Sequence, residues 1–119
     1  MSLKIDLRSG EKVYVGNSIL TVASDERSTI IIDGTLPVIR ENDFIHQEQA
    51  TTPLLSLTHA VQMHYLVLEQ YSVSSIFHVY LSTTWENSAS ISNAMKLVSQ
   101  GELYKAIRVL KDVLKIEAR

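Results

Sequence analysis

The residues able to carry acid–base, nucleophilic or metal chemistry are scattered through this 119-residue sequence rather than spaced as a site. Among the histidines, His59 and His64 are five positions apart, which places them on different faces of a helix, and no H-E-x-x-H spacing occurs. The sequence has no cysteine, no G-x-S-x-G elbow for a serine nucleophile and no glycine-rich phosphate loop. We therefore expect no metal site, no cofactor and no catalytic residue, and so a protein that is not an enzyme.

One charge pattern is ordered, and it lies on the last expected helix. Basic residues recur every three or four positions on the face away from Leu103 and Leu110. The members of this pattern are Lys105, Arg108, Lys111 or Asp112, Lys115 and Arg119. A solvated helix face explains the pattern, and so does the helix dipole, which favours basic residues near a helix end. A phosphate-contacting surface formed by Lys105, Arg108 and Lys115 is the alternative interpretation.

The overall charge is slightly acidic, at −2. Residues 1–50 carry five Lys and Arg against eight Asp and Glu, and residues 51–119 carry six against five. A dedicated nucleic-acid binder usually has a basic excess, because neutralising phosphates supplies much of its affinity. Composition alone thus argues against RNA or DNA binding, and any basic surface must be local.

The sequence shows no targeting or membrane signal. Residues 1–7 alternate polar and apolar side chains and lack the continuous apolar core of a signal peptide. No apolar run approaches the roughly 18 residues that a membrane-spanning helix needs. The absence of cysteine gives no sign of an oxidising compartment. We expect a cytoplasmic protein.

The first part of the chain has the period-two pattern of short strands. Leu3, Ile5 and Leu7 alternate with polar residues, and the β-branched run 29–32 predicts a buried strand. Further strands are expected at 13–15, 19–22 and 38–39, with turns at Ser9-Gly10, Gly16-Asn17 and Asp33-Gly34. Several short strands at this spacing predict a small β barrel or sandwich over residues 1–46.

Helical patterns fill the remainder, residues 47–119. Thr52 can cap a helix that starts at Pro53, since proline suits the first helical position, and this helix is expected to fade near Ser72. A second helix is expected around residues 76–81, where aromatic and β-branched residues leave a strand as the alternative.

Two more helices complete the expected bundle of three to four. Apolar residues at helical spacing mark one over residues 91–98, which Gly101 ends. The last, from Glu102 to about Ala118, has the clearest period, with one apolar face. That face comprises Leu103, Ala106, Ile107, Leu110, Val113 and Leu114. The fold class is therefore α+β, and we expect the strand and helical parts to form one compact unit.

Several blocks of the sequence resemble the FlbT family, in the family's order and over nearly the whole chain. The first blocks are L-K-I-D-L-R-S-G-E-K-V-Y-V-G (3–16) and I-D-G-T-L-P-V-I-R-E-N-D (32–43). The later ones are Thr52-Pro53, A-V-Q-M-H-Y-L (60–66), G-E-L-Y-K-A-I-R-V-L-K (101–111) and Glu117-Ala118. The segment 71–93 departs most from the family pattern.

This resemblance implies a post-transcriptional regulator of flagellin synthesis in flagellum biogenesis. The family is associated with the 5′ untranslated region of flagellin mRNA, where it represses translation and promotes decay, or activates in some members. The resemblance also implies a functional link to the flagellin adaptor FlaF.

The opening L-K-I-D-L-R-S-G-E, followed by V-Y-V-G, is also similar to the start of CsrA, a small RNA-binding translational regulator. Pro37 and Arg40-Glu41 resemble the CsrA segment that leads to its RNA-contacting arginine, although the stretch between Arg27 and Arg40 is shorter here. Carried over by position, Ile5 and Arg40 correspond to RNA-binding residues. CsrA is an intertwined dimer, so the similarity implies a homodimer, and unpaired strand edges favour the same expectation.

Lys4, Arg8 and Arg40 are our candidate RNA-binding residues. Lys4 lies on the opposite side of its strand from Ile5, so Lys4 should point outward while Ile5 packs. Lys4 and Arg8 can also be read as ordinary exposed charges, and Arg40 as the partner of Glu41, Asp43 or another turn carboxylate.

Two functions remain open at this point. The first is an RNA-binding regulator that contacts a flagellin mRNA leader through the strand-rich part. The second is a protein-interaction module whose helical part binds FlaF or flagellin, with RNA contact indirect. The acidic net charge favours the second function, and the similarity to CsrA favours the first.

Overall fold

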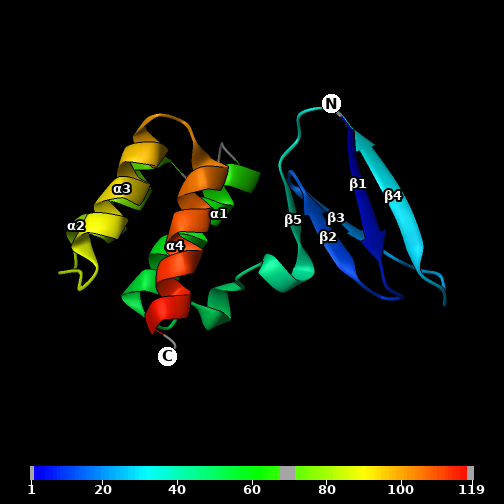
Figure 1. The fold of residues 1–119 in the computed structure, drawn as a ribbon, viewed down its shortest axis with the longest axis horizontal. Helices are drawn as coiled ribbons and strands as arrows, with labels where there is room; N and C mark the ends of the chain where they lie inside the picture. The colour runs from blue at the N-terminus through cyan, green and yellow to red at the C-terminus, as the bar shows by residue number, and fades with distance from the viewer. Residues whose placement is uncertain (1, 68–71, 118–119) are drawn as a thin grey trace. The chain divides into compact units, whose positions relative to one another are not determined.

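Five short strands occupy the first part of the chain in the computed structural model, which describes residues 2–67 and 72–117 (Figure 1). They are β1 (Ser2–Leu7), β2 (Lys12–Val15), β3 (Ser18–Thr21), β4 (Ser28–Asp33) and β5 (Val38–Arg40). β1 pairs antiparallel with β4, and β2 lies between β3 and β5 in a second antiparallel sheet. Within the described residues these sheets do not close into a barrel, so the sandwich form of the expectation applies.

The alternating apolar residues of both sheets form one core. Ile5 and Leu7 of β1 and Val13 and Val15 of β2 are all buried, with at most 9% of their surface exposed. Partly buried residues pack against these four, namely Val22, Ile30, Ile32 and Val38. The period-two prediction for the first strand is therefore confirmed at Ile5 and Leu7, which are buried, and at Lys4, which is exposed, whereas Leu3 is 46% exposed.

The prediction of a buried strand over 29–32 is half wrong. β4 does form there, but its residues alternate between half-buried and exposed, and Ile31 is 64% exposed. A β-branched run indicates extended backbone, but it cannot show whether both faces are covered. β4 turns Ile30 and Ile32 toward the core and Ile31 away from it.

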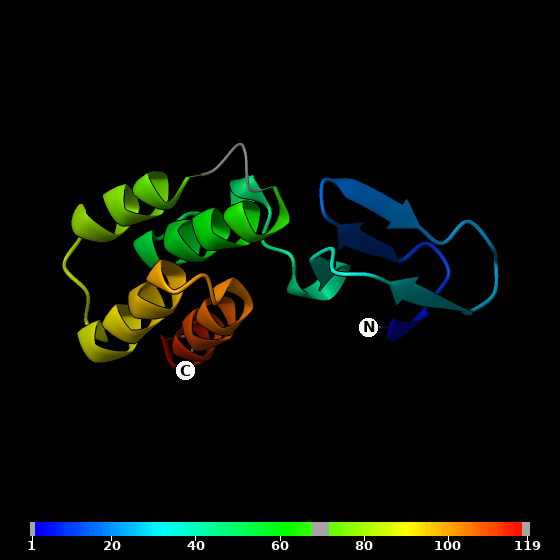
Figure 2. The ribbon, with the colours of Figure 1, turned by 90° about the horizontal axis from the view of Figure 1, so that it is seen from above.

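Four helices follow in the described part of the chain: α1 (Pro53–Leu66), α2 (Val73–Leu81), α3 (Ser88–Ser99) and α4 (Leu103–Glu117). Two short 3-10 turns, η1 (Glu41–Asp43) and η2 (Gln47–Gln49), precede them. α4 packs against α1 and along α3, and α2 packs mainly on α1 (Figure 2). The expected α+β class with a helical second part is confirmed, and the segment around 76–81 is a helix rather than a strand.

The helix starts and ends follow local chemistry. The Thr52 hydroxyl accepts a hydrogen bond from the Leu55 N–H at 3.2 Å, and Pro53 begins α1, as the sequence predicts. α1 ends at Leu66, several residues before the expected fade near Ser72, and residues 68–71 lie outside the described residues. Gly101, with φ 77°, follows the end of α3.

The last helix has the strongest amphipathic pattern of the described helices, and four of the six residues on its predicted apolar face are buried, while Leu103 and Leu114 are partly buried. Its buried residues are Ala106, Ile107, Leu110 and Val113. α4 begins at Leu103 and is described to Glu117, so the expected end at Ala118 lies outside the described residues. None of the described helices is both long enough and apolar enough to cross a membrane.

The chain divides into two compact units, Met1–Phe44 and Ile45–Arg119. We call them the strand unit and the helical unit. The strand unit has the two-sheet core described above, and the helical unit has a core built mainly from α1, α3 and α4. That both parts form one compact unit stays a prediction.

Candidate functional site

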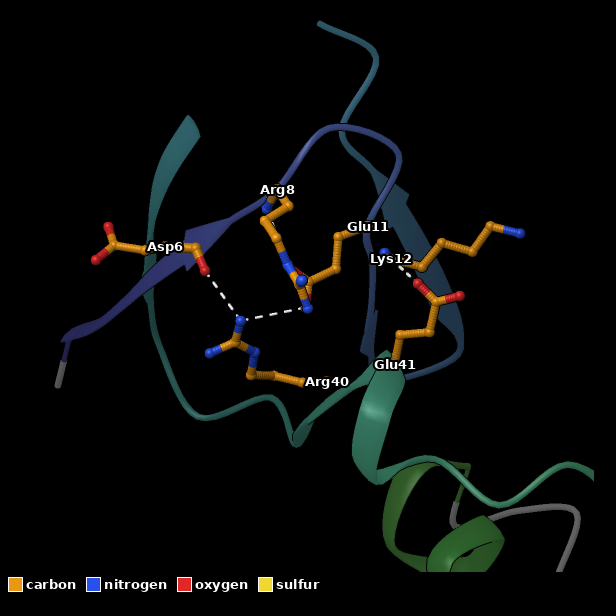
Figure 3. A network of polar contacts seen from close by, with 6 residues as sticks. All are labelled: Asp6, Arg8, Glu11, Lys12, Arg40 and Glu41. Carbon is orange, nitrogen blue, oxygen red and sulfur yellow. Dashed lines mark hydrogen bonds and ion pairs between the residues drawn. The ribbon is translucent and has the colours of Figure 1, made fainter. Parts of the chain in front are cut away.

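Arg40 ends β5, opposite Val13 of β2, and its side chain is held by two acceptors within the strand unit. Its Nη2 atom donates to the Asp6 backbone carbonyl at 3.0 Å and to the Glu11 carboxylate at 3.2 Å (Figure 3). The Arg40 side chain is 45% exposed, whereas that of Glu11 is 7% exposed. A solvent-accessible cation is therefore held by a buried carboxylate.

Glu11 owes its position to the turn between β1 and β2. Gly10 has φ 76°, a backbone conformation that suits glycine, and the Glu11 N–H donates to the Arg8 carbonyl at 3.0 Å. The Glu11 carboxylate in turn accepts from the Arg8 N–H, also at 3.0 Å. The turn thus folds the Glu11 side chain back over its own backbone and leaves its second oxygen for Arg40.

The electrostatics of the turn favour the ionised form of Glu11. The Arg8 N–H holds the pKa of Glu11 below its ordinary value, and the hydrogen bond and charge of Arg40 act in the same direction. Burial opposes these effects by raising the pKa, but the net direction is downward. Glu11 is therefore a carboxylate at neutral pH, and its ion pair with Arg40 is intact there.

Asp6 contacts Arg40 through its backbone carbonyl, whereas its side chain contacts a different residue. Its carboxylate accepts from the Thr29 hydroxyl at 2.6 Å and points away from Arg40 (Figure 3). The Thr29 hydrogen bond lowers the pKa of Asp6, as do the positive charges of Lys4, Arg27 and Arg40. Burial opposes these effects, but the net shift is downward, so the ionised form of this exposed β1 residue is favoured.

Each of the three candidate cations of the strand unit acts electrostatically on one or both of two carboxylates, those of Asp6 and Glu11. Arg8 and Arg40 both lie near Glu11, and Lys4 lies near Asp6. Arg40 pairs with a turn carboxylate, as the alternative interpretation of this residue expected. That carboxylate is Glu11 rather than the neighbouring Glu41, which accepts from the Lys12 N–H at 2.9 Å. Ile5, the other position carried over from CsrA, is buried in the core.

The candidate basic face of α4 lies in the helical unit. Lys105 forms an ion pair with Glu102 at 3.4 Å, three residues before it. Arg108 and Lys115 are exposed, on the side of α4 opposite its buried face. This arrangement is compatible both with a solvated helix face and with a surface for phosphate.

Sequence reasoning expected a turn carboxylate as a possible partner of Arg40 but did not identify Glu11, and it missed the Asp6 carbonyl, Thr29 and Arg27. The turn Ser9-Gly10-Glu11 is a signal that was available, since a glycine turn can direct the next side chain back toward the preceding strand. Pairing between Glu11 and Arg40 bridges 29 residues, so no local pattern could have predicted it.

The family model of flagellar protein FlbT matches residues 3–119. The chain belongs to the FlbT family. This confirms the resemblance that the sequence blocks indicated. Similarity to CsrA in the strand unit stays a prediction.

Curated FlbT proteins match over nearly all of the chain. A probable flagellum biosynthesis repressor protein FlbT of Rhodopseudomonas palustris is 32% identical, over 98% of this chain and 95% of its own length. Probable FlbT 1 of Bradyrhizobium diazoefficiens is 29% identical, over 100% of this chain and 84% of its own. The flagellum biosynthesis repressor protein FlbT of Caulobacter vibrioides is 25% identical, over 98% and 87%. No solved structure matches the chain.

The lowered pKa of Glu11 makes the stability of this FlbT-family protein depend on pH. Because the pKa of Glu11 is lower in the folded chain than its ordinary value of 4.5, its ionisation stabilises the fold above that value. This stabilisation is lost as pH falls below 4.5 through the folded-state pKa. We expect Glu11→Gln to lower the melting temperature at neutral pH and to lose less stability than wild type when the pH falls from about 6 to about 3. Melting curves across this range test it, and parallel losses in the two proteins would contradict it. The pKa of Asp6 is lowered as well, so the Glu11→Gln protein should keep part of the acid sensitivity of the wild type.

Proposed function

We propose that this protein regulates flagellin synthesis after transcription, by associating with the 5′ untranslated region of flagellin mRNA and repressing its translation or promoting its decay. The observation that carries the proposal is the FlbT family match over residues 3–119, with relatives named as flagellum biosynthesis repressors. Family membership supports a regulatory role in flagellar synthesis. The protein acts in the cytoplasm by binding, without catalysis or a cofactor.

The RNA site of this proposal is the exposed part of the Arg40 side chain, together with Lys4 and Arg8. Phosphate groups are attracted by cations, and Arg40 presents nearly half of its side chain to solvent while its Nη2 is anchored. Single-stranded leader RNA suits such a surface, since its backbone and bases are accessible. The carboxylates of Asp6 and Glu11 reduce the net charge of this surface. RNA binding therefore depends on where the cations lie more than on the total charge.

A salt titration with purified protein and a flagellin leader RNA tests direct contact. Affinity should fall as salt rises, because phosphate contacts release counterions. Arg40→Glu should weaken binding by about tenfold or more, since it removes a cation and adds an anion at the site. Melting curves of the same preparation are needed, because the new carboxylate would also face Glu11. Unchanged affinity of the folded variant would end the direct-contact version.

A second candidate function is a protein-interaction module in which the helical unit binds FlaF or flagellin. The observation that favours it is the set of large apolar side chains that the helices leave exposed. Leu81 is 75% exposed, Tyr104 52% and Ile116 56%. Binding of purified FlaF or flagellin to the protein, with no affinity for the leader RNA, would favour this function over the first.

We also expect the protein to form a homodimer through the strand unit. Leu3 and Leu20 sit opposite Ile32 and Val13 in their sheets, on the core-facing sides, yet they are 46% and 45% exposed. Small sheets with open edges are often completed by a second chain. Sedimentation or light scattering should therefore give twice the 13.4 kDa chain mass at micromolar concentration. A monomeric mass would contradict the expectation.

A further inference from the structure

The two hydrogen bonds of Arg40 engage one particular nitrogen of its guanidinium. Both are donated by Nη2, and they diverge to acceptors on different sides, so each uses its own hydrogen (Figure 3). A guanidinium has five N–H donors, and it offers two forks for paired acceptors. The end-on fork joins Nη1 to Nη2, and the side-on fork joins Nε to Nη2. Both forks therefore share the atom that the protein already engages.

Reading a base by a bidentate contact requires a complete fork, because two acceptors on one base edge must be met together. Arg40 cannot supply one while Glu11 and the Asp6 carbonyl hold Nη2. Its Nε and Nη1 hydrogens make no hydrogen bond to the described residues. Separate donors of this kind suit phosphate oxygens, which carry charge and accept single N–H bonds.

Glu11 is well placed to control this behaviour. Its side chain is 7% exposed and is itself fixed by the Arg8 N–H at 3.0 Å, so it gives Arg40 a rigid anchor. A carboxylate beside an RNA site also repels phosphate. The geometry and the charge of Glu11 therefore predict opposite effects on RNA affinity, which makes the two separable by experiment.

We propose that Glu11 is a positioning residue that holds Arg40 as a phosphate contact, and not as a reader of base edges. The inference rests on the proposed function, because it concerns the same RNA site. It deepens that function by assigning Arg40 to the RNA backbone, so that any sequence preference must come from other residues.

The first test replaces Glu11 by glutamine and measures affinity for the leader RNA by fluorescence anisotropy. Loss of the charge-assisted anchor should weaken binding by about threefold to tenfold, although a repelling charge has been removed. Glu41→Gln is the matched control, since this nearby carboxylate binds the Lys12 N–H and not Arg40. It should bind as tightly as wild type or more tightly.

A second variant, Glu11→Asp, keeps the charge but retracts the carboxylate from Arg40, and it should weaken binding as well. Melting curves identify the variants that fold. A folded Glu11→Gln protein that binds the leader as tightly as wild type, or more tightly, overturns the positioning role.

The second test compares Arg40→Gln with wild type on the leader and on a scrambled single strand of equal length. A phosphate contact predicts the same fold loss on both RNAs and a salt dependence reduced by about 0.7 in log–log slope. A greater loss on the leader than on the scrambled strand means base readout and overturns the backbone assignment. Wild-type protein that binds neither RNA overturns the proposed function and this inference together, whereas the outcomes above concern the inference alone.

Discussion

Replacing Leu57 with alanine is expected to lower the free energy of unfolding by about 2–5 kcal/mol, the range for large-to-small changes in a packed core. Leu57 is fully buried, with 0% of its surface exposed, on the helix that packs against both α2 and α4. Alanine would remove apolar contacts and leave a cavity that these neighbours can fill only in part. Urea unfolding followed by far-ultraviolet circular dichroism measures the change.

Leu81→Ala is the matched control for this substitution. It removes the same atoms from α2, but Leu81 is 75% exposed, so the change should stay within about 0.5 kcal/mol. A Leu57→Ala protein as stable as Leu81→Ala would show that α1 does not pack as described.

The helical unit could be predicted well from the sequence, because its signals are local. The period of α4 places Ala106, Ile107 and Leu110 on one face, and these residues are buried as expected. Thr52 caps α1, and this cap can be predicted from the few residues around the helix start, because a threonine before a proline is typical of that position. The end of α1 was misplaced because apolar spacing continues past Leu66, and the pattern carries no stop signal there.

The strand unit was predictable in its strands but not in their pairing. β1 and β2 follow each other along the chain, yet β1 pairs with β4 and lies in a different sheet from β2. A period-two pattern identifies a strand and its buried face, but it does not specify the neighbour. The alternation could not show that Ile31 would be exposed, because that depends on which strands cover β4.

In the candidate site, Arg40 could be predicted from the sequence, but its partners could not. Resemblance to CsrA points to Arg40, and the 45% exposure of its side chain is consistent with a surface role. Its partners, Glu11 and the Asp6 carbonyl, come from the other end of the strand unit, so no spacing rule could reveal them. They change the chemistry expected of Arg40, since the anchored Nη2 removes the bidentate contact that arginine otherwise favours.

Gln62 is a residue whose role the sequence concealed. In the sequence Gln62 interrupts an apolar stretch, and none of its surface is exposed in the fold. Its side-chain amide accepts from the Ile45 N–H at 2.8 Å and donates to the Ile45 carbonyl at 2.8 Å. One amide therefore satisfies both backbone groups of the residue that begins the helical unit.

Substitution of Gln62 by methionine, which has similar length and no amide, is expected to destabilise the protein by about 1–3 kcal/mol. The reason is that both backbone groups of Ile45 lose their partner, while the apolar replacement recovers only part of the loss. Amide hydrogen exchange at Ile45 should accelerate in the variant, which distinguishes a lost hydrogen bond from a general packing defect. Gln100→Met, at an exposed glutamine after α3, is the matched control and should leave both stability and exchange at Ile45 unchanged. If Gln62→Met destabilises the protein but exchange at Ile45 matches that of wild type, the amide contributes through packing, and its two hydrogen bonds add nothing to the stability of the helical unit.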